Sequence, residues 1–177
     1  MAAVSPAPGV TLDFDAVYFE HFAFVWRSLR RLGVPEEHVE DAAQDVFLVA
    51  HQKLETFNGT SSVKTWLFGI THLMALTYAR RQRRKGGLQP LPEGLASPAP
   101  SPERQTQSAE AGAFLDAFLD TLDDGRRAVF VLAELEQMTA PEIAEALQVN
   151  PNTVYSRLRA ARQAFQQAVN ERVRGEA

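Results

Sequence analysis

One segment, residues 86–112, constrains the fold of this chain more than any other because its composition is unsuited to a packed core. It contains five of the chain's ten prolines, four of its ten glycines and no aromatic residue. Such a segment buries too little apolar surface to offset the entropy lost on ordering it. We therefore expect a flexible Pro/Gly-rich linker between two small bodies, residues 13–85 and 113–177. We expect residues 1–12 to form a disordered N-terminal extension.

Apolar residues in both bodies recur at intervals of three or four, which is the spacing of one buried helix face. The alternating pattern of a half-buried strand is absent from the sequence. The apolar faces begin at Phe14, Val39 and Val63 in the first body and at Phe114, Val129, Ile143 and Val154 in the second. The sequence therefore predicts an all-α fold made of two small helical domains.

The second body contains the pattern of a helix-turn-helix. Thr139 and Glu142 have the spacing of a capping box at the start of a short helix. Asn150 followed by Pro151 has the pattern of a cap and first turn of another helix. Two helices joined by so short a turn match the motif whose second helix enters the major groove of DNA.

The second helix of this motif is predicted to turn a polar face away from its apolar stripe. Arginine can read guanine or bind phosphate, and short hydroxyl and amide side chains approach phosphates closely. A solvated amphipathic helix is the alternative, but the capped start, the tight turn and the absence of acidic residues between Pro151 and Asn170 favour DNA binding. The predicted DNA-contacting residues are Asn152, Thr153, Tyr155, Ser156, Arg157, Arg159 and Arg162.

Charge is distributed along the chain in blocks, although the net charge is only −4. Residues 80–85 hold five basic side chains and no acidic one, whereas residues 13–58 hold nine acidic and four basic ones. A basic helix end suits the DNA backbone, and Trp66, Phe68 and Tyr78 just upstream suit stacking on unpaired bases. A charged start to the linker is the alternative interpretation of this cluster.

Several classes of protein are excluded by what the sequence lacks. There are no cysteines, and the four histidines, His21, His38, His51 and His72, have no metal-ligand spacing. No glycine-rich phosphate loop or nucleophile elbow is present, so we expect no enzymatic activity, no cofactor and no metal. No apolar run approaches the roughly 18 residues of a membrane span, and the N-terminus lacks a signal-peptide pattern. We expect a cytoplasmic protein without membrane insertion.

Three motifs, in order around residues 86–112, resemble those of the extracytoplasmic-function (group IV) sigma factors of bacterial RNA polymerase. Residues 39–48 (VEDAAQDVFL) resemble the acidic polymerase-binding helix of that family. Residues 66–70 (WLFGI) followed by 78–81 (YARR) resemble its "WLyrI…RR" segment. Residues 142–144 (EIA) followed by 153–159 (TVYSRLR) resemble its "EIA…TVkSRL" signature.

The resemblance implies that the two bodies bind different targets. The first would bind core RNA polymerase and the minus-ten promoter element, and the second would read the minus-35 element. The implied polymerase contacts are Asp41, Gln44, Asp45 and Phe47. A loop at residues 57–62 would capture a flipped-out base of the melted strand. The implied minus-ten residues are Phe57, Asn58, Gly59, Thr60, Ser61, Trp66, His72, Arg80, Arg81, Arg83 and Arg84.

The function expected from this resemblance is that of an alternative sigma factor, with core polymerase, promoter DNA and an anti-sigma factor as partners. Some positions depart from the family pattern: Leu73 and Thr77 replace a usual Asn and Asp, and Gly69 replaces a usual arginine. The alternative function is a helix-turn-helix regulator that binds duplex DNA without polymerase, which leaves the first body unexplained. A structural adaptor would not need the two arginine-rich faces.

Overall fold

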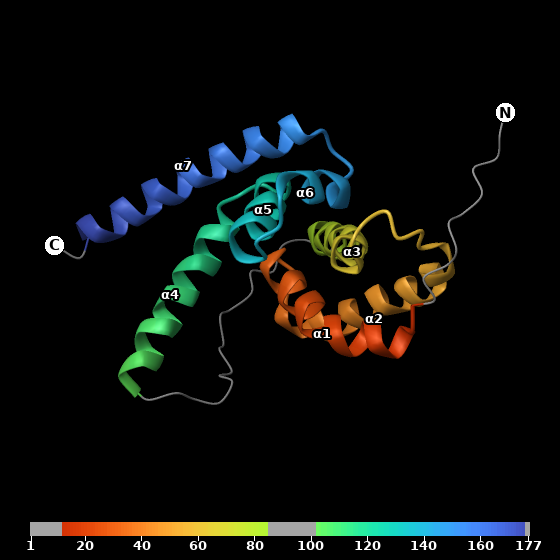
Figure 1. The fold of residues 1–177 in the computed structure, drawn as a ribbon. Helices are drawn as coiled ribbons and strands as arrows, with labels where there is room; N and C mark the ends of the chain where they lie inside the picture. The colour runs from red at the N-terminus through yellow and green to blue at the C-terminus, as the bar shows by residue number, and fades with distance from the viewer. Residues whose placement is uncertain (1–11, 85–101, 176–177) are drawn as a thin grey trace.

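The computed structural model describes residues 12–84 and 102–175, and within them it contains helices and no strand (Figure 1). This confirms the all-α prediction. The N-terminal body consists of α1 (Phe14–Arg31), α2 (Glu36–Lys53), the short 3₁₀ turn η1 (Leu54–Thr56) and α3 (Val63–Arg84). The C-terminal body consists of α4 (Pro102–Asp120), α5 (Asp124–Phe130), the π turn η2 (Val131–Leu135), α6 (Ala140–Leu147) and α7 (Pro151–Gly175).

Side-chain caps set the starts of the helices that matter for function. The Ser62 hydroxyl accepts a hydrogen bond from the backbone N–H of Thr65 at 3.0 Å, at the start of α3. The Glu142 carboxylate accepts from both the backbone N–H and the hydroxyl of Thr139, at 2.8 and 2.7 Å. The Asn150 side chain accepts from the backbone N–H two residues later, at 2.8 Å. The predicted capping box and the predicted cap at Asn150 are therefore confirmed.

The helix-turn-helix follows directly from these caps. Helix α6 ends at Leu147, and Gln148 then adopts the left-handed conformation with φ of 54°. Its side-chain amide donates to the backbone carbonyl of Glu145 at 2.7 Å, and α7 begins three residues later at Pro151. The two helices are thus joined by a turn of the expected length.

The C-terminal end of the predicted linker is helical. Helix α4 begins at Pro102, so residues 102–112, expected to be linker, belong to this helix. Proline suits the first turn of a helix, and a helix anchored by buried Phe118 and Leu119 extends at little cost through residues that carry no apolar face. The rest of the expected linker, 86–101, and residues 1–11 of the expected N-terminal extension lie outside the described residues. Leu12 packs partly buried against the core.

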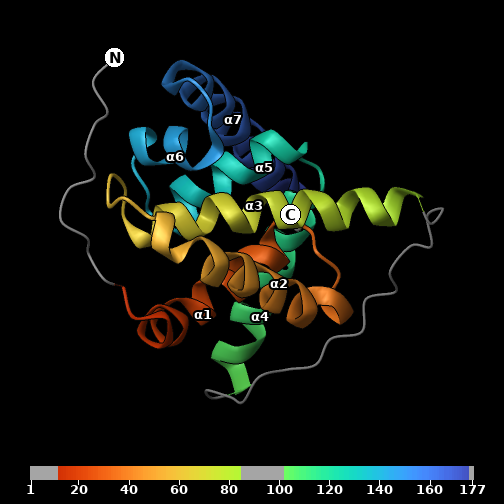
Figure 2. The same ribbon diagram turned by 90° about the vertical axis from the view of Figure 1, so that its right-hand side faces the viewer.

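The two bodies pack on each other, which the sequence did not predict. Figure 2 shows α3 running between α1 and α2 on one side and α5 and α6 on the other. One buried apolar cluster accordingly runs through both bodies and includes Phe68 of α3, Val129 of α5 and Ile143 of α6. A second, smaller cluster lies within the C-terminal body, where Phe118, Phe130 and Phe165 pack with ring centroids 5.0–5.5 Å apart.

The contribution of the capping box at the start of α6 to the free energy of unfolding can be tested directly. Thr139→Ala removes the hydroxyl but leaves the backbone in place, and we expect a loss of about 1 kcal/mol in the free energy of unfolding, the usual cost of deleting such a cap. Thr139→Ser keeps a capping hydroxyl and should stay close to the wild type. Chemical denaturation followed by far-ultraviolet circular dichroism measures both. Equal stability of the alanine variant and the wild type would show that the cap contributes nothing.

Candidate nucleic-acid interface

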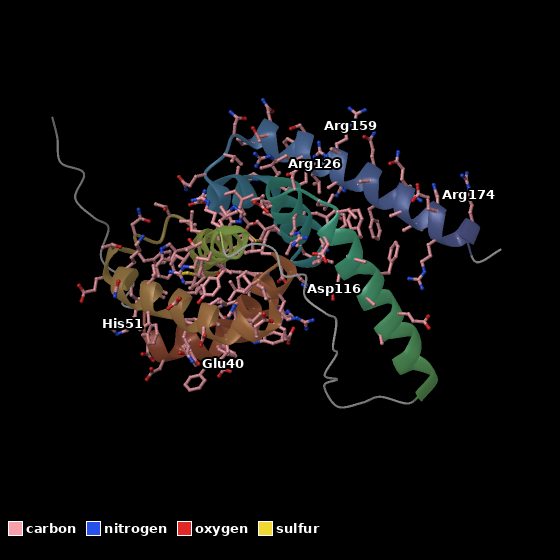
Figure 3. All side chains as sticks on the ribbon, turned by 180° about the vertical axis from the view of Figure 1, so that it is seen from behind. Glu40, His51, Asp116, Arg126, Arg159 and Arg174 are labelled. Atoms are coloured by element: carbon pink, nitrogen blue, oxygen red, sulfur yellow. The ribbon has the colours of Figure 1, made fainter. Side chains whose placement is uncertain are left out.

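The outer face of α7 carries an exposed polar surface. Asn152, Tyr155, Ser156 and Arg159 are all exposed. The exposed fraction of Tyr155 is 58%. In Figure 3, Arg159 projects from α7 away from the rest of the molecule. These four predicted DNA-contacting residues therefore share one accessible face.

Three other predicted DNA-contacting residues of α7 are either half-buried or paired with an acidic side chain. Thr153 and Arg157 are half-buried. The Arg157 guanidinium crosses Gly125 of α5 so closely that a Cβ on that glycine would lie 3.0 Å from it. Arg162 is exposed, but its guanidinium is bound to the Glu134 carboxylate at 2.7–2.8 Å. Both guanidinium groups therefore already contact other residues of the C-terminal body.

The loop between η1 and α3 is a tight turn with an exposed tip. The Asn58 side-chain oxygen accepts from the backbone N–H and the hydroxyl of Thr60, at 3.1 and 2.8 Å. Gly59 has a φ of 69°, which favours glycine, and open space surrounds its Cα. Phe57 turns back toward Trp66, with ring centroids 5.2 Å apart. The structure thus brings the predicted loop residues and Trp66 together.

A cleft of about 400 Å³ lies between this loop, α3 and the end of α6. The predicted residues Phe57, Asn58, Thr60, Ser61, Trp66 and His72 line it, as does Leu73. Its other wall consists of Glu145, Ala146, Leu147 and Gln148. The contribution of α6 was missed by sequence reasoning, because nothing in a single sequence indicates that residues so far apart meet.

His72 lies where α3 meets the C-terminal body. It is half-buried, its Nδ1 atom finds no hydrogen-bond partner among the described residues, and its ring stacks on Phe68 with centroids 6.3 Å apart. Burial lowers the pKa of His72 below its ordinary value of 6.5. The negative charge of Asp124 opposes this effect, and the positive charge of Arg157 adds to it. The neutral imidazole is therefore the form that this contact favours.

The basic end of α3 is only partly described. Arg80 and Arg81 are exposed, and the Arg81 guanidinium lies 5.4 Å from the ring centroid of Tyr78. The side chains of Arg83 and Arg84 lie outside the described residues.

Two of the three aromatic residues expected to stack on unpaired bases are core residues. Phe68 is fully buried, and Tyr78 is buried with its hydroxyl bound to Asp45. Trp66 is half-buried and lines the cleft, so it alone of the three remains a candidate for stacking.

The acidic face of α2 is exposed as expected, with one correction. Asp41 and Gln44 are exposed, and Asp45 is half-buried and accepts a hydrogen bond from the Tyr78 hydroxyl at 3.1 Å. Burial raises the pKa of Tyr78, and this bond raises it further. Phe47, predicted as a polymerase contact, is only 3% exposed and packs on Tyr18, so it is a core residue.

Leu48 is a residue of this face that sequence reasoning missed. It is 60% exposed, and its position four residues after Gln44 and seven after Asp41 places it on the same side of the helix. That spacing was available in the sequence. An exposed leucine beside two polar residues suits a protein contact.

The described residues offer little for other kinds of site. They contain no group of three histidine or acidic side chains placed to hold a metal ion. None of their helices is both long and apolar enough to cross a membrane.

Comparison with known proteins agrees with the order of these features. Residues 17–85 match the family model "Sigma-70 region 2", and residues 115–165 match "Sigma-70, region 4". The RNA polymerase sigma factor CnrH of Cupriavidus metallidurans is 31% identical over 169 residues, which cover 90% of this chain and 88% of that protein. The chain belongs to the extracytoplasmic-function sigma factors. It is therefore an alternative sigma factor that directs promoter recognition.

Another relative agrees with this family assignment, and two solved structures share the fold. The ECF RNA polymerase sigma-E factor of Escherichia coli K12 is 27% identical over 150 residues, covering 80% of this chain and 78% of that one. The fold matches CnrH in complex with the cytosolic domain of CnrY, with a TM-score of 0.66, 23% identity and coverage of 89% and 88%. It also matches RpoE bound to the anti-sigma factor NepR from Bartonella quintana, with a TM-score of 0.73, 21% identity and coverage of 89% and 97%.

The half-buried His72 predicts a pH dependence of this sigma factor's stability. Its pKa is lower in the folded state than in the unfolded state, so below about pH 6.5 the unfolded chain binds more protons. The contribution of His72 is thus fully present above pH 6.5 and is lost as the pH falls toward the folded-state pKa. His72→Gln removes the titrating group, so the unfolding midpoint of the variant should fall less than that of the wild type between pH 7.5 and 5.5. Equal falls of the unfolding midpoint in the wild type and the variant would contradict the lowered pKa of His72.

Proposed function

We propose that this sigma factor uses three surfaces, two that bind promoter DNA and one that binds RNA polymerase. The minus-35 surface is the exposed face of α7 with Asn152, Tyr155, Ser156 and Arg159. The minus-ten surface is the loop at residues 57–62 with Trp66, His72 and the basic end of α3. The polymerase surface is the face of α2 with Asp41, Gln44, Asp45 and Leu48.

The observation that carries the proposal is the combination of a capped helix-turn-helix with an exposed polar face on its second helix. The capping box fixes α6, Asn150 fixes the start of α7, and the face beyond it holds amide, hydroxyl and guanidinium groups. Such groups contact phosphates and base edges in the major groove. Arg157 and Arg162 would join this surface once their guanidinium groups leave Gly125 and Glu134.

The minus-ten assignment rests on the cleft beside the loop. Its exposed loop tip, the half-buried Trp66 ring and the neutral His72 offer both stacking and hydrogen-bonding groups to an extruded base. The exposed guanidinium groups of Arg80 and Arg81 would bind the backbone of the same strand.

We also infer an anti-sigma partner and action in the cytoplasm, where polymerase works. Both solved structures described above hold a sigma factor with another protein, CnrY in one and the anti-sigma factor NepR in the other. Their family relationship to this chain supports an inhibitor of the same kind for it.

A transcription assay with the purified chain, bacterial core polymerase and fragmented genomic DNA from the source organism tests the proposal. Discrete transcripts that require both proteins are expected, and their start sites would locate both promoter elements. Specific retention of duplex DNA by the chain alone, without any transcript, would favour the helix-turn-helix regulator instead.

The minus-35 surface predicts a specific arginine effect. Arg159→Ala should weaken promoter binding of the holoenzyme by about 1–3 kcal/mol if the side chain contacts a base edge. Arg174→Ala is the matched control, because Arg174 is another exposed arginine near the far end of the same helix (Figure 3). Binding is measured on a mapped promoter at fixed salt. Equal losses of promoter binding in the two variants would show that Arg159 contributes only its positive charge and makes no contact with a base edge.

The polymerase surface predicts that charge reversal on α2 blocks assembly. Asp41→Arg places a cation on the exposed acidic face and should abolish co-elution with core polymerase, while the helical circular dichroism stays unchanged. Asp45→Arg should also weaken assembly, but it breaks the bond to Tyr78 as well. Glu20→Arg, a charge reversal at another exposed acidic residue, on α1, serves as the control. Normal co-elution of the Asp41 variant with core polymerase would contradict the assignment of α2 to the polymerase surface.

A further inference from the structure

Helix α1 presents an apolar stripe to solvent on the side away from its own core. Phe19 is 80% exposed, which is the largest exposed fraction among the large apolar side chains of the described residues. Ala23 and Trp26 follow it at helical spacing, and Ala23 is exposed while Trp26 is half-buried. Figures 1 and 2 show α1 at the edge of the molecule, with α3 between it and α6. The stripe belongs to none of the three surfaces proposed above.

We propose that this side of α1 binds the same side of a second copy of the chain, with the two helices antiparallel. In such a two-fold pair each residue of one copy meets a given residue of the other and is met by it in return. The inference goes beyond the proposed function and does not depend on it, because it concerns the chain without polymerase or DNA. We call the residues that form this contact, Asp15, Phe19, Ala23, Trp26 and Arg30, the α1 face.

The order of charges along α1 makes the helix complementary to itself. Its N-terminal half carries the exposed acidic residues Asp15 and Glu20, and its C-terminal half carries the exposed basic residues Arg27 and Arg30. Two parallel copies would place like charges opposite each other, whereas two antiparallel copies place acidic residues opposite basic ones. The helix dipole favours the same order of charges within one chain, but it gives no reason for an exposed phenylalanine between them.

One register brings the apolar and the charged residues of the α1 face together. A two-fold axis just before Ala23 is equally far from Phe19 and Trp26, and it is also equally far from Asp15 and Arg30. Phe19 then lies against Trp26 of the second copy, and Asp15 lies against Arg30 of the second copy. The small side chain of Ala23 lies at the crossing point, where it lets the helix axes approach to about 8 Å, the close end of the usual range.

Trp26 and Arg30 are already arranged to receive this partner. The Arg30 guanidinium lies 5.3 Å from the ring centroid of Trp26, and its Nε atom lies 2.9 Å from the Glu36 carboxylate. A guanidinium has five N–H donors, so Arg30 can keep this ion pair and also bind Asp15 of the second copy. The Trp26 ring, held by Arg30, is an aromatic partner for Phe19 of the second copy, and such ring pairs add to the gain from buried area.

The size of the α1 face predicts a weak dimer. Two helices in contact over about four turns, with one phenylalanine and one tryptophan from each copy, bury roughly 1,000 Å² in total, which is near the lower limit of specific interfaces. Interfaces of this size belong to weak and transient complexes. We therefore expect a dissociation constant in the micromolar range, so that the chain is monomeric when dilute and dimeric when concentrated.

Sedimentation equilibrium of the purified chain tests the self-association. The weight-average mass should rise from that of the monomer toward that of the dimer between about 1 and 200 μM, a range that brackets the affinity of a weak interface. Phe19→Ala should keep the mass of the monomer throughout, and the variant should fold normally because this side chain is exposed. Val173→Ala is the matched control, because Val173 is an exposed apolar residue of α7 with 62% of its surface open to solvent.

Exchange of charges tests the antiparallel register. Asp15→Arg and Arg30→Asp each place like charges opposite each other at both ends of the dimer, so each variant alone should remain monomeric. A mixture of the two variants places opposite charges together at both ends, and so does a chain that carries both substitutions. Both samples should therefore dimerise again, which no contact at another surface would produce. Far-ultraviolet circular dichroism checks that each variant keeps its helical fold.

The outcomes separate this dimer from other uses of the same face. Loss of the dimer in Phe19→Ala and its recovery on exchange of charges support the inference. A wild type that stays monomeric at every concentration overturns it, and so does a dimer that persists in Phe19→Ala. Single charge variants whose mixture stays monomeric overturn the antiparallel register. A monomeric wild type together with loss of co-elution of Phe19→Ala with core polymerase would make the face a polymerase contact instead.

Discussion

The position of α3 between the two bodies is the constraint on which the rest of this structure depends. One side of the helix packs on α1 and α2, and the other packs on α5 and α6, so Phe68 and Leu67 are fully buried. A helix covered on two sides needs small or apolar residues around most of its circumference, and Gly69 is the smallest of them. The cleft beside the loop at residues 57–62 exists because α6 approaches α3 this closely.

The charge distribution follows from the same arrangement. The chain carries a net charge of −4, yet its N-terminal body presents three cations to a single buried carboxylate at Glu136. A buried ion pair adds little to stability compared with apolar packing, and its attested use is to specify one arrangement among several. We infer that the contact of Glu136 with these three cations specifies how the two bodies pack, whereas the apolar cluster supplies most of the packing.

The sequence predicted what depends on neighbouring residues and missed what depends on distant ones. The Thr139 box and the Asn150 cap were identified because a cap and its partner lie within three residues of each other. Phe47 was misassigned because an aromatic residue in an acidic motif can face either way until α1 is in place. The helix through 102–112 was missed because it lacks an apolar stripe of its own. The ion pairs of Glu136 with Lys64 and Arg31 and the contact of Gly69 with Ala146 join residues more than 70 positions apart, which no local pattern indicates.

The packing of the two bodies also bears on how two modest DNA surfaces can give specific recognition. Linking two sites raises the effective concentration of the second only if both can engage at the same time. The two bodies lie against each other here, with α6 forming one wall of the cleft and Arg157 lying over Gly125. The separation of the two proposed DNA surfaces when both are engaged therefore decides how much specificity the link between them adds.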